Sequence, residues 1–284
     1  MIPMLEYILS QIVIRALIAS LLASLTSALV GSFIVLRRLS TMGAAIAHVC
    51  FAGAMVAYVT DVDPSLGALS MSLTLATAIS YARSRREGQS EAILGAAIGI
   101  SSAIAALALS LSREYSAVAF SYLVGDVLGV SEREIALLFT ASTITLVIVA
   151  LLYRGLKYST LDPETAEAMG LRVEVYEYVL SFLAAVLLVV EMRVVGMILA
   201  QVYIVAPAAS AWELAHSVEG VIAVAAVLAF ISAIAGFSIS LAFNLPTSAT
   251  IGIVAAVIYV LSLLLSPKRR GRCLLAFLKR ECRV

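Results

Sequence analysis

Charged residues are scarce in this sequence: they make up 13% of its 284 residues, whereas about 25% is typical of a soluble domain. Hydrophobic residues make up 62%, and the formal net charge is only +1. A soluble core cannot bury that much apolar surface, whereas lipid solvates it. The near-neutral charge also gives no bulk basic surface for nucleic acid. We therefore expect a membrane protein with no nucleic-acid partner.

Cysteine is rare as well, with three residues and no CxxC pair. Cys50 lies in an apolar stretch, where a small buried thiol is expected. Cys273 and Cys282 lie in a basic C-terminal segment, and thiols on the cytosolic side stay reduced. The sequence therefore predicts neither a disulfide framework nor a zinc site.

Several motifs that carry known chemistry are missing. There is no GxxxxGK[ST] loop, so we do not expect this chain to bind ATP through a P-loop. There is no HExxH motif of a zinc protease and no regular arginine series of a voltage sensor. With only two histidines, His48 and His216, a haem protein is poorly supported. What remains is a permease-like body, and we expect no stably bound cofactor.

Long apolar runs fill most of the sequence. About 20 apolar residues cross a bilayer as a helix, and such runs must be helical because a backbone in lipid has to satisfy its own hydrogen bonds. The predicted fold class is all-α, a polytopic membrane helix bundle of about nine transmembrane helices. The sixth run is the weakest, and its loss would leave eight. The predicted spans are residues 12–36, 44–59, 64–82, 91–111, 134–153, 176–190, 194–211, 221–243 and 249–265.

Positive charges predict the orientation, because short cytoplasmic loops are rich in lysine and arginine. If the arginine pair after the first span is inside, most later basic residues also fall inside. Residues 1–266 then form a transmembrane domain of the plasma membrane with its N-terminus outside. Residues 267–284 form a basic cytoplasmic tail, which we expect on the anionic inner leaflet. The inner basic residues are Arg37, Arg38, Arg83, Arg85, Arg86, Arg154, Lys157, Arg172 and those from Lys268 onward.

Two features belong to the predicted outer face. Residues 117–130, AVAFSYLVGDVLGV, are too short to span and contain Gly125 and Asp126. A run of this length is typical of a re-entrant or interfacial segment, so we expect a short helix and a turn. Glu191 and Arg193 flank the turn after the sixth span, where we expect them to pair with each other or to contact a binding protein.

A short capped helix is predicted on the cytoplasmic side, between the fifth and sixth spans. Residues 157–172 read KYSTLDPETAEAMGLR. Thr160 or Asp162 suits the N-cap, and Pro163 suits the first turn. Two glutamates lie near the positive end of the helix dipole, and Gly170 is a natural stop. The spacing alone fits an ordinary loop helix and a docking helix for a soluble partner equally well.

Four blocks of the sequence resemble the membrane permease subunits of ABC importers for zinc, manganese and iron. They occur in the family's order and spread over most of the chain. The first and third blocks are fairly specific, whereas the fourth is mostly apolar. In chain order they are GSFIVLRRLSTMGAAIAHVCFAG (31–53), LVGDVLGVS (123–131), LDPETAEAMGL (161–171) and VVGMILAQVYIVAPAASA (194–211).

The resemblance implies a transport pathway between two permeases, with a homodimer expected. It implies cytosolic ATPase subunits docked on the third block and an extracytoplasmic binding protein that delivers a divalent metal ion as substrate. ATP hydrolysis would then belong to a separate chain, and this chain would be no enzyme. The residues that match the family's coupling helix are Leu161, Asp162, Pro163, Glu164, Ala166, Met169 and Gly170.

The first block departs from the family pattern, which has an acid four residues before its histidine. This sequence keeps His48 but has Ala44 at the position of the acid. An acid and an imidazole one turn apart can meet around an ion, whereas imidazole alone selects weakly among metals. His48 is the expected metal contact in the pathway, and a hydrogen bond to serine or backbone at a helix interface is the alternative. Gln201 and Tyr203 are lower-ranked pathway candidates, for which packing between helices is the favoured interpretation.

Other functions also fit parts of this sequence. A permease of the related siderophore and cobalamin importers has a similar coupling segment, although those chains usually have more spans. An ATPase-independent channel or ion carrier would need no coupling helix. A membrane enzyme would have to use His48 as its base, without an acidic or histidine partner nearby in the sequence.

Overall fold

The structure is a computed structural model that describes residues 11–84, 90–111, 117–125 and 127–268. Every regular element in these ranges is an α-helix. Nine of the described helices are long and apolar enough to cross a membrane. The prediction of an all-α polytopic bundle with nine spans is therefore confirmed, and eight spans are not supported.

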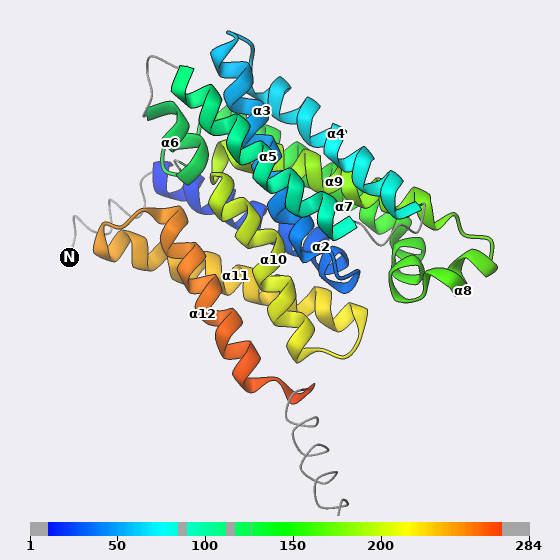
Figure 1. Cartoon of the computed structure of the whole chain (residues 1–284). Coiled ribbons are helices and arrows are strands. Elements are labelled where there is room, and N and C mark those ends of the chain that lie inside the picture. Colours follow the sequence, from blue (N-terminus) through cyan, green and yellow to red (C-terminus); the bar gives the residue numbers. More distant parts are fainter. Residues whose placement is uncertain (1–10, 85–89, 112–116, 126, 269–284) are drawn as a thin grey trace, which may run out of the picture.

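The nine long helices follow one another along the chain and pack into a tilted bundle (Figure 1). Two short helices, α6 (Ala117–Val124) and α8 (Pro163–Ala168), interrupt the series, and α8 lies at one end of the bundle. The long helices are α2 (Gln11–Leu36), α3 (Ser40–Val59), α4 (Pro64–Ser84), α5 (Ser90–Leu111), α7 (Glu132–Leu161), α9 (Val173–Val194), α10 (Met197–Leu214), α11 (Val218–Phe243) and α12 (Thr247–Leu265).

The expectation that the sixth span is the weakest is wrong. α9 has 22 residues, and its most apolar window has a mean hydropathy of 2.0. The least hydropathic span is α4, at 1.2. Serine and threonine lower this value, and five of their hydroxyls donate to carbonyls of the same helix; that of Thr74, for example, donates to the carbonyl of Ser70 at 2.8 Å. These bonds within the helix reduce the cost of the polar composition of α4 in a membrane.

α2 lies at the centre of the bundle, in contact with α3, α7, α9, α10 and α11. Of its most apolar window, 72% is buried. Small residues let the neighbouring helices approach closely. At Gly31 a Cβ would stand only 1.8 Å from the carbonyl oxygen of Ile204 in α10. The two backbones touch here, so only glycine fits this position of α2.

α6 ends in a second close contact. Gly125 follows it with a φ of +81°, and Gly196 in the α9–α10 turn has a φ of +83°. A Cβ on Gly196 would stand 2.3 Å from the backbone nitrogen of Gly125. With only eight residues, α6 is a short helix followed by a turn, as predicted. Its place at the outer face depends on the orientation of the chain, which stays a prediction.

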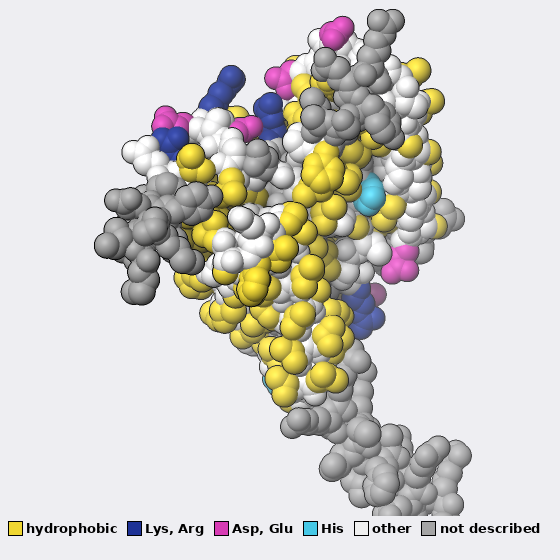
Figure 2. All heavy atoms as spheres, turned by 90° about the vertical axis from the view of Figure 1, so that its left-hand side faces the viewer, with side chains coloured by type: hydrophobic (Ala, Val, Ile, Leu, Met, Phe, Trp, Pro, Cys, Tyr) yellow, Lys and Arg dark blue, Asp and Glu magenta, His cyan; other side chains and the backbone are white. Residues whose placement is uncertain are grey.

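The surface fits a multi-pass membrane protein. Hydrophobic side chains cover much of the face in Figure 2, and charged side chains gather toward its edges. Cys50 is buried, as expected. Of the predicted tail, only Pro267 and Lys268 are described, and the Lys268 ammonium lies 4.8 Å from the ring centroid of Trp212. The predictions for Arg85, Arg86, Asp126, Cys273 and Cys282 concern positions outside the described residues.

Candidate functional site

α8 begins with a complete N-cap. The Asp162 carboxylate accepts a hydrogen bond from the backbone N–H of Thr165 at 3.1 Å, and Pro163 occupies the first helical position. The hydroxyl and the backbone N–H of Thr165 hold the pKa of the Asp162 carboxyl below its usual range. Gly170 follows with a φ of +86°, a conformation that ends helices. The predicted helix and its stop are confirmed, and Asp162 rather than Thr160 is the cap.

Most of the surface of α8 points outward. Leu161 and Met169 flank the helix with 58% and 59% exposure, and Glu164 is exposed between them. Ala166 is fully buried and anchors the helix. Exposed apolar side chains rimmed by polar ones are typical of a docking surface. One continuous segment thus holds all the predicted coupling residues: Leu161, Asp162, Pro163, Glu164, Ala166, Met169 and Gly170.

A hollow of about 440 Å³ opens beside α8, toward the start of α9 and the end of α4. Its charged lining is mostly acidic, which gives this end of the bundle a negative rim. Such a rim complements a basic surface on a partner. The charged residues that line the hollow are Arg83, Asp162, Glu164, Glu167, Glu174 and Glu177.

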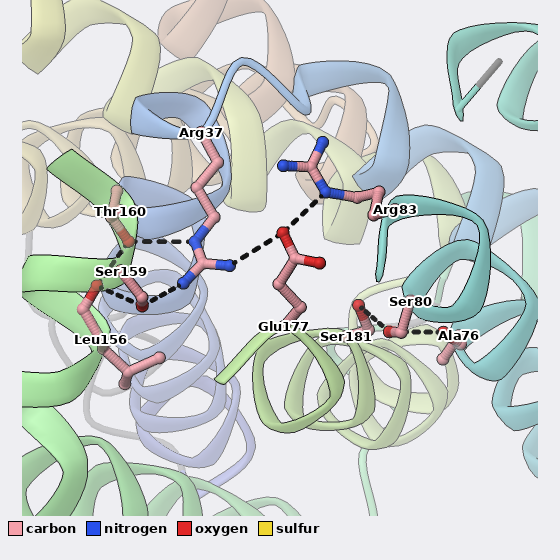
Figure 3. Close-up of polar contacts among 9 residues, drawn as sticks. All are labelled: Arg37, Ala76, Ser80, Arg83, Leu156, Ser159, Thr160, Glu177 and Ser181. Atoms are coloured by element: carbon pink, nitrogen blue, oxygen red, sulfur yellow. Dashed lines mark hydrogen bonds and ion pairs between the residues drawn. The ribbon is translucent and has the colours of Figure 1, made fainter. Parts of the chain in front are cut away.

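At the edge of this hollow, Arg37 is the centre of a polar cluster that the sequence did not predict (Figure 3). Its Nε donates to the Thr160 hydroxyl at 3.0 Å, and its Nη2 donates to the Ser159 hydroxyl at 2.7 Å. Its Nη1 lies 3.6 Å from a Glu177 carboxylate oxygen, which Arg83 Nε approaches to 3.0 Å. Arg37 entered the sequence argument only as a marker of orientation, because these partners lie 122 and 123 positions away in α7.

The Arg37 guanidinium is almost completely enclosed, with a side-chain exposure of 3%. Burial lowers its pKa to about 10, and the nearby Glu177 carboxylate acts in the opposite direction. The side chain is therefore still charged at neutral pH. A buried charge needs a counter-charge and hydrogen-bond acceptors, and Glu177, Ser159 and Thr160 provide them.

His48 lies in α3 and is partly exposed. Its Nδ1 is 3.2 Å from the hydroxyl oxygen of Ser102 in α5, and Ala44 lies one turn before it. Among the described residues, no group of three or more His, Cys, Asp or Glu side chains could hold a metal ion. The contact with Ser102 fits the packing alternative, and the role of His48 as a metal contact stays a prediction.

α5 beside His48 exposes a face of small residues. A Cβ added to Gly95 or to Gly99 would meet nothing within 4 Å. Ala96 and Ala103 are exposed on the same helix. A GxxxG spacing with small neighbours lets two membrane helices approach closely. Within one chain, this face of α5 is left uncovered.

The two lower-ranked pathway candidates differ in their surroundings. Tyr203 is fully buried, and its hydroxyl oxygen lies 2.7 Å from that of Ser20 in α2. This geometry suits a packing contact between α10 and α2. Gln201 is partly exposed, and its Oε1 has no hydrogen-bond partner among the described atoms. The Gln201 Oε1 atom is thus a buried acceptor without a partner among the described atoms, whereas the Tyr203 hydroxyl already has its partner.

The prediction for Glu191 is wrong. Glu191 is fully buried, and both of its carboxyl oxygens contact the Ser27 hydroxyl, at 2.8 and 2.7 Å. The last turn of α9 faces α2 rather than solvent, so this side chain reaches neither Arg193 nor a soluble partner. Arg193 instead lines a separate hollow together with Asp63 and Arg133.

Comparison with known families identifies relatives along almost the whole chain. The model of a family described as the ABC 3 transport family matches residues 9–266. A manganese transport system membrane protein, MntC of Listeria monocytogenes, is 30% identical over 84% of this chain and 85% of its own length. A manganese import system permease protein, ScaB of Streptococcus parasanguinis, is 28% identical over 85% of this chain and 86% of its own length.

Solved structures give the same result for the fold. The PsaBC complex of Streptococcus pneumoniae, solved with a Fab, contains a chain with a TM-score of 0.81 and 27% identity. The match covers 95% of this chain and 98% of that one. An inward-facing metal-chelate type ABC transporter matches with a TM-score of 0.73 at 15% identity, which indicates a shared fold only.

Proposed function

This chain belongs to the ABC 3 transport family, and we propose that it is the membrane permease subunit of an importer that carries a divalent transition-metal ion into the cell. Zinc, manganese and iron are the candidate ions, and the names of the relatives favour manganese. ATP hydrolysis belongs to a separate cytosolic chain, because this sequence has no P-loop.

The observation that carries this proposal is α8. It is a capped helix outside the spans, with one buried anchor, Ala166, and it is flanked by two exposed apolar side chains, Leu161 and Met169. A soluble ATPase docks on this surface, and the acidic hollow beside α8 receives a basic segment of it. This end of the bundle is then cytoplasmic, as the positive-inside rule predicts, and the N-terminus lies outside the plasma membrane.

The small-residue face of α5 supports a second permease as partner. Gly95 and Gly99 stand open in the single chain, and a second copy covers them in the membrane. The pathway runs along this homodimer interface, where His48 and Ser102 lie close to the exposed face. Each copy contributes one imidazole as a transient metal contact, and Gln201 is a further candidate.

An extracytoplasmic binding protein delivers the metal at the opposite end of the bundle. The hollow lined by Asp63, Arg133, Glu134 and Arg193 is a charged feature on that side. A permease of the siderophore and cobalamin importers is the alternative function. It is less well supported, because the relatives at 28 and 30% identity are named for manganese, whereas the metal-chelate type structure shares only 15% identity.

The test is metal uptake by the reconstituted complex of this chain with its ATPase and binding protein. We expect ATP-dependent uptake of radioactive manganese into liposomes, with zinc and iron as competitors that rank the three ions. Uptake by this chain alone, without ATPase or ATP, would refute the ABC mechanism. Uptake of a metal chelate but of no free ion would favour the siderophore-type alternative.

A further inference from the structure

We propose that Arg37 is a positioning residue that couples movement of α8 to the membrane helices α2 and α3. This inference rests on the proposed function, in which α8 is the docking helix of the ATPase. The coupling runs from the last turn of α7 through Arg37 to the turn between α2 and α3. Three observations carry it.

The first observation is the position of the residues that Arg37 binds. Ser159 and Thr160 lie in the last turn of α7, and only Leu161 and Asp162 separate them from the first residue of α8. Both are buried, and both side chains accept hydrogen bonds from Arg37. A displacement of α8 that shifts the end of α7 therefore acts directly on the guanidinium.

The second observation is the position of Arg37 in the chain. It directly follows α2, in the short turn that leads to α3. The turn is tied back to α2 by backbone hydrogen bonds from Arg37 to Phe33, at 3.1 Å, and from Leu39 to Ile34, at 3.0 Å. Arg38 has a φ of 59°, which makes the reversal tight. A force on Arg37 thus reaches the end of α2 and the start of α3, the helix that carries His48.

The third observation is the unequal contacts of the cluster. Glu177 of α9 lies 3.0 Å from Arg83 of α4 but 3.6 Å from Arg37, whereas Arg37 donates to Ser159 at 2.7 Å. In this conformation Arg37 is bound more closely to α7 than to the ion pair behind it. The Glu177 carboxylate therefore lies within reach as a second partner, so a shift of the end of α7 changes how Arg37 divides its contacts between α7 and α9.

The experiment compares two neighbouring arginines in the reconstituted complex. Arg37→Gln removes the buried charge, and Arg38→Gln makes the same change of charge at the exposed next position. Three quantities are measured: binding of the ATPase, ATP turnover, and metal ions transported per ATP. For Arg37→Gln we expect normal binding and turnover, with transport per ATP lowered about tenfold, a typical allosteric coupling. Arg38→Gln should behave like the wild type.

A merely structural role would lower the yield or the thermal stability of the complex but leave transport per ATP unchanged. That result for Arg37→Gln would overturn the proposal. If Arg37→Gln does not assemble, the Ser159→Ala, Thr160→Val double variant removes the acceptors in α7 and keeps every charge. It should assemble and lose coupling, and a normal ratio in this variant would also overturn the proposal. If the wild-type complex shows no ATP-dependent metal uptake, the proposed function fails instead.

Discussion

Helices α5 and α7 are equally exposed in the single chain, yet different side chains form their exposed faces. In each helix, 22% of the most apolar window is buried. α7 exposes large side chains such as Phe139 and Leu151. α5 exposes Ile100, Leu107 and Leu111, but it also exposes a strip of small residues around Gly95 and Gly99. Large branched and aromatic side chains suit lipid, while small ones suit a second helix. Exposure alone is the same in the two helices, and the strip of small residues on α5 is the feature on which the proposed interface with a second copy rests.

The two helices also differ in what lies next to them. α5 carries Ser102, the hydrogen-bond partner of His48. α7 ends at α8 and holds Arg37 through Ser159 and Thr160. In the proposed importer, α5 therefore belongs to the pathway and the dimer interface, whereas α7 belongs to the part that couples the ATPase to the membrane helices. This difference between α5 and α7 leads to four predictions.

The largest expected effect is loss of the dimer. Gly99→Leu should leave the protomer folded, since its Cβ meets nothing in one chain and leucine favours helix over glycine. It should weaken the pairing of two copies about tenfold or more, because the helices can no longer approach closely. Subunit counting in liposomes measures this. Val147→Leu on the exposed face of α7 is the control. Equal dimer loss in both variants would show that the small-residue face of α5 is not the interface.

The next effect concerns ATPase docking at the end of α7. Glu164→Arg reverses a charge on α8 and should weaken co-purification of the ATPase about tenfold, because like charges then meet across the interface. Glu132→Arg makes the same change near the start of α7, where the exposed Arg15–Glu132 pair contributes little. Normal docking and transport in Glu164→Arg would remove α8 from the coupling role.

Substitution of His48 tests whether the pathway lies beside α5. His48→Ala should lower metal uptake several-fold while changing the thermal stability little, whereas Ser102→Ala should leave most uptake intact. If both variants lose stability and neither loses uptake, the contact between the two side chains is for packing. Ala44→Asp provides the converse test: a carboxylate suits manganese better than imidazole does, so manganese uptake should rise relative to zinc.

The smallest effect is local. Asp162→Ala removes the N-cap of α8, which should cost about 1 kcal/mol of local helix stability. Hydrogen exchange at the backbone amide of Thr165 should become faster by several-fold, because this N–H loses its acceptor. Unchanged exchange would mean that packing around Ala166 alone holds α8. Ala166→Ser is a useful comparison, since it places a hydroxyl at the buried anchor and leaves the cap intact.

Two kinds of feature could be predicted from the sequence. The nine spans follow from run length, because lipid allows an apolar backbone to cross only as a closed hydrogen-bonded element. The cap, start and stop of α8 follow from local chemistry between residues at most a few positions apart. The sequence left the choice between Thr160 and Asp162 as the cap open. In the structure Thr160 lies in the last turn of α7, where its hydroxyl donates to the carbonyl of Leu156 at 2.6 Å and accepts from Arg37.

The packing partners could not be predicted in the same way. Ser27 and Glu191 are 164 positions apart and meet in the core, although Glu191 was expected at the outer face. Arg37 entered the sequence argument only as a marker of orientation, and its ion-pair partner Glu177 did not enter it. In a soluble helix, the polar face would indicate which side points outward. In this protein nearly every face of each spanning helix is apolar, so the sequence pattern does not indicate which side of a helix faces protein and which side faces lipid.

The sequence by itself determined the number of spans, their helical form and the short capped helix between α7 and α9, because each depends on local hydrogen bonding or on run length. Only the tertiary structure decided that α2 lies at the centre, that Glu191 is buried against Ser27, and that Arg37 joins α7 to α9. These outcomes depend on the close contact of backbones at Gly31 and on the free-energy cost of burying a polar group without a hydrogen-bond partner.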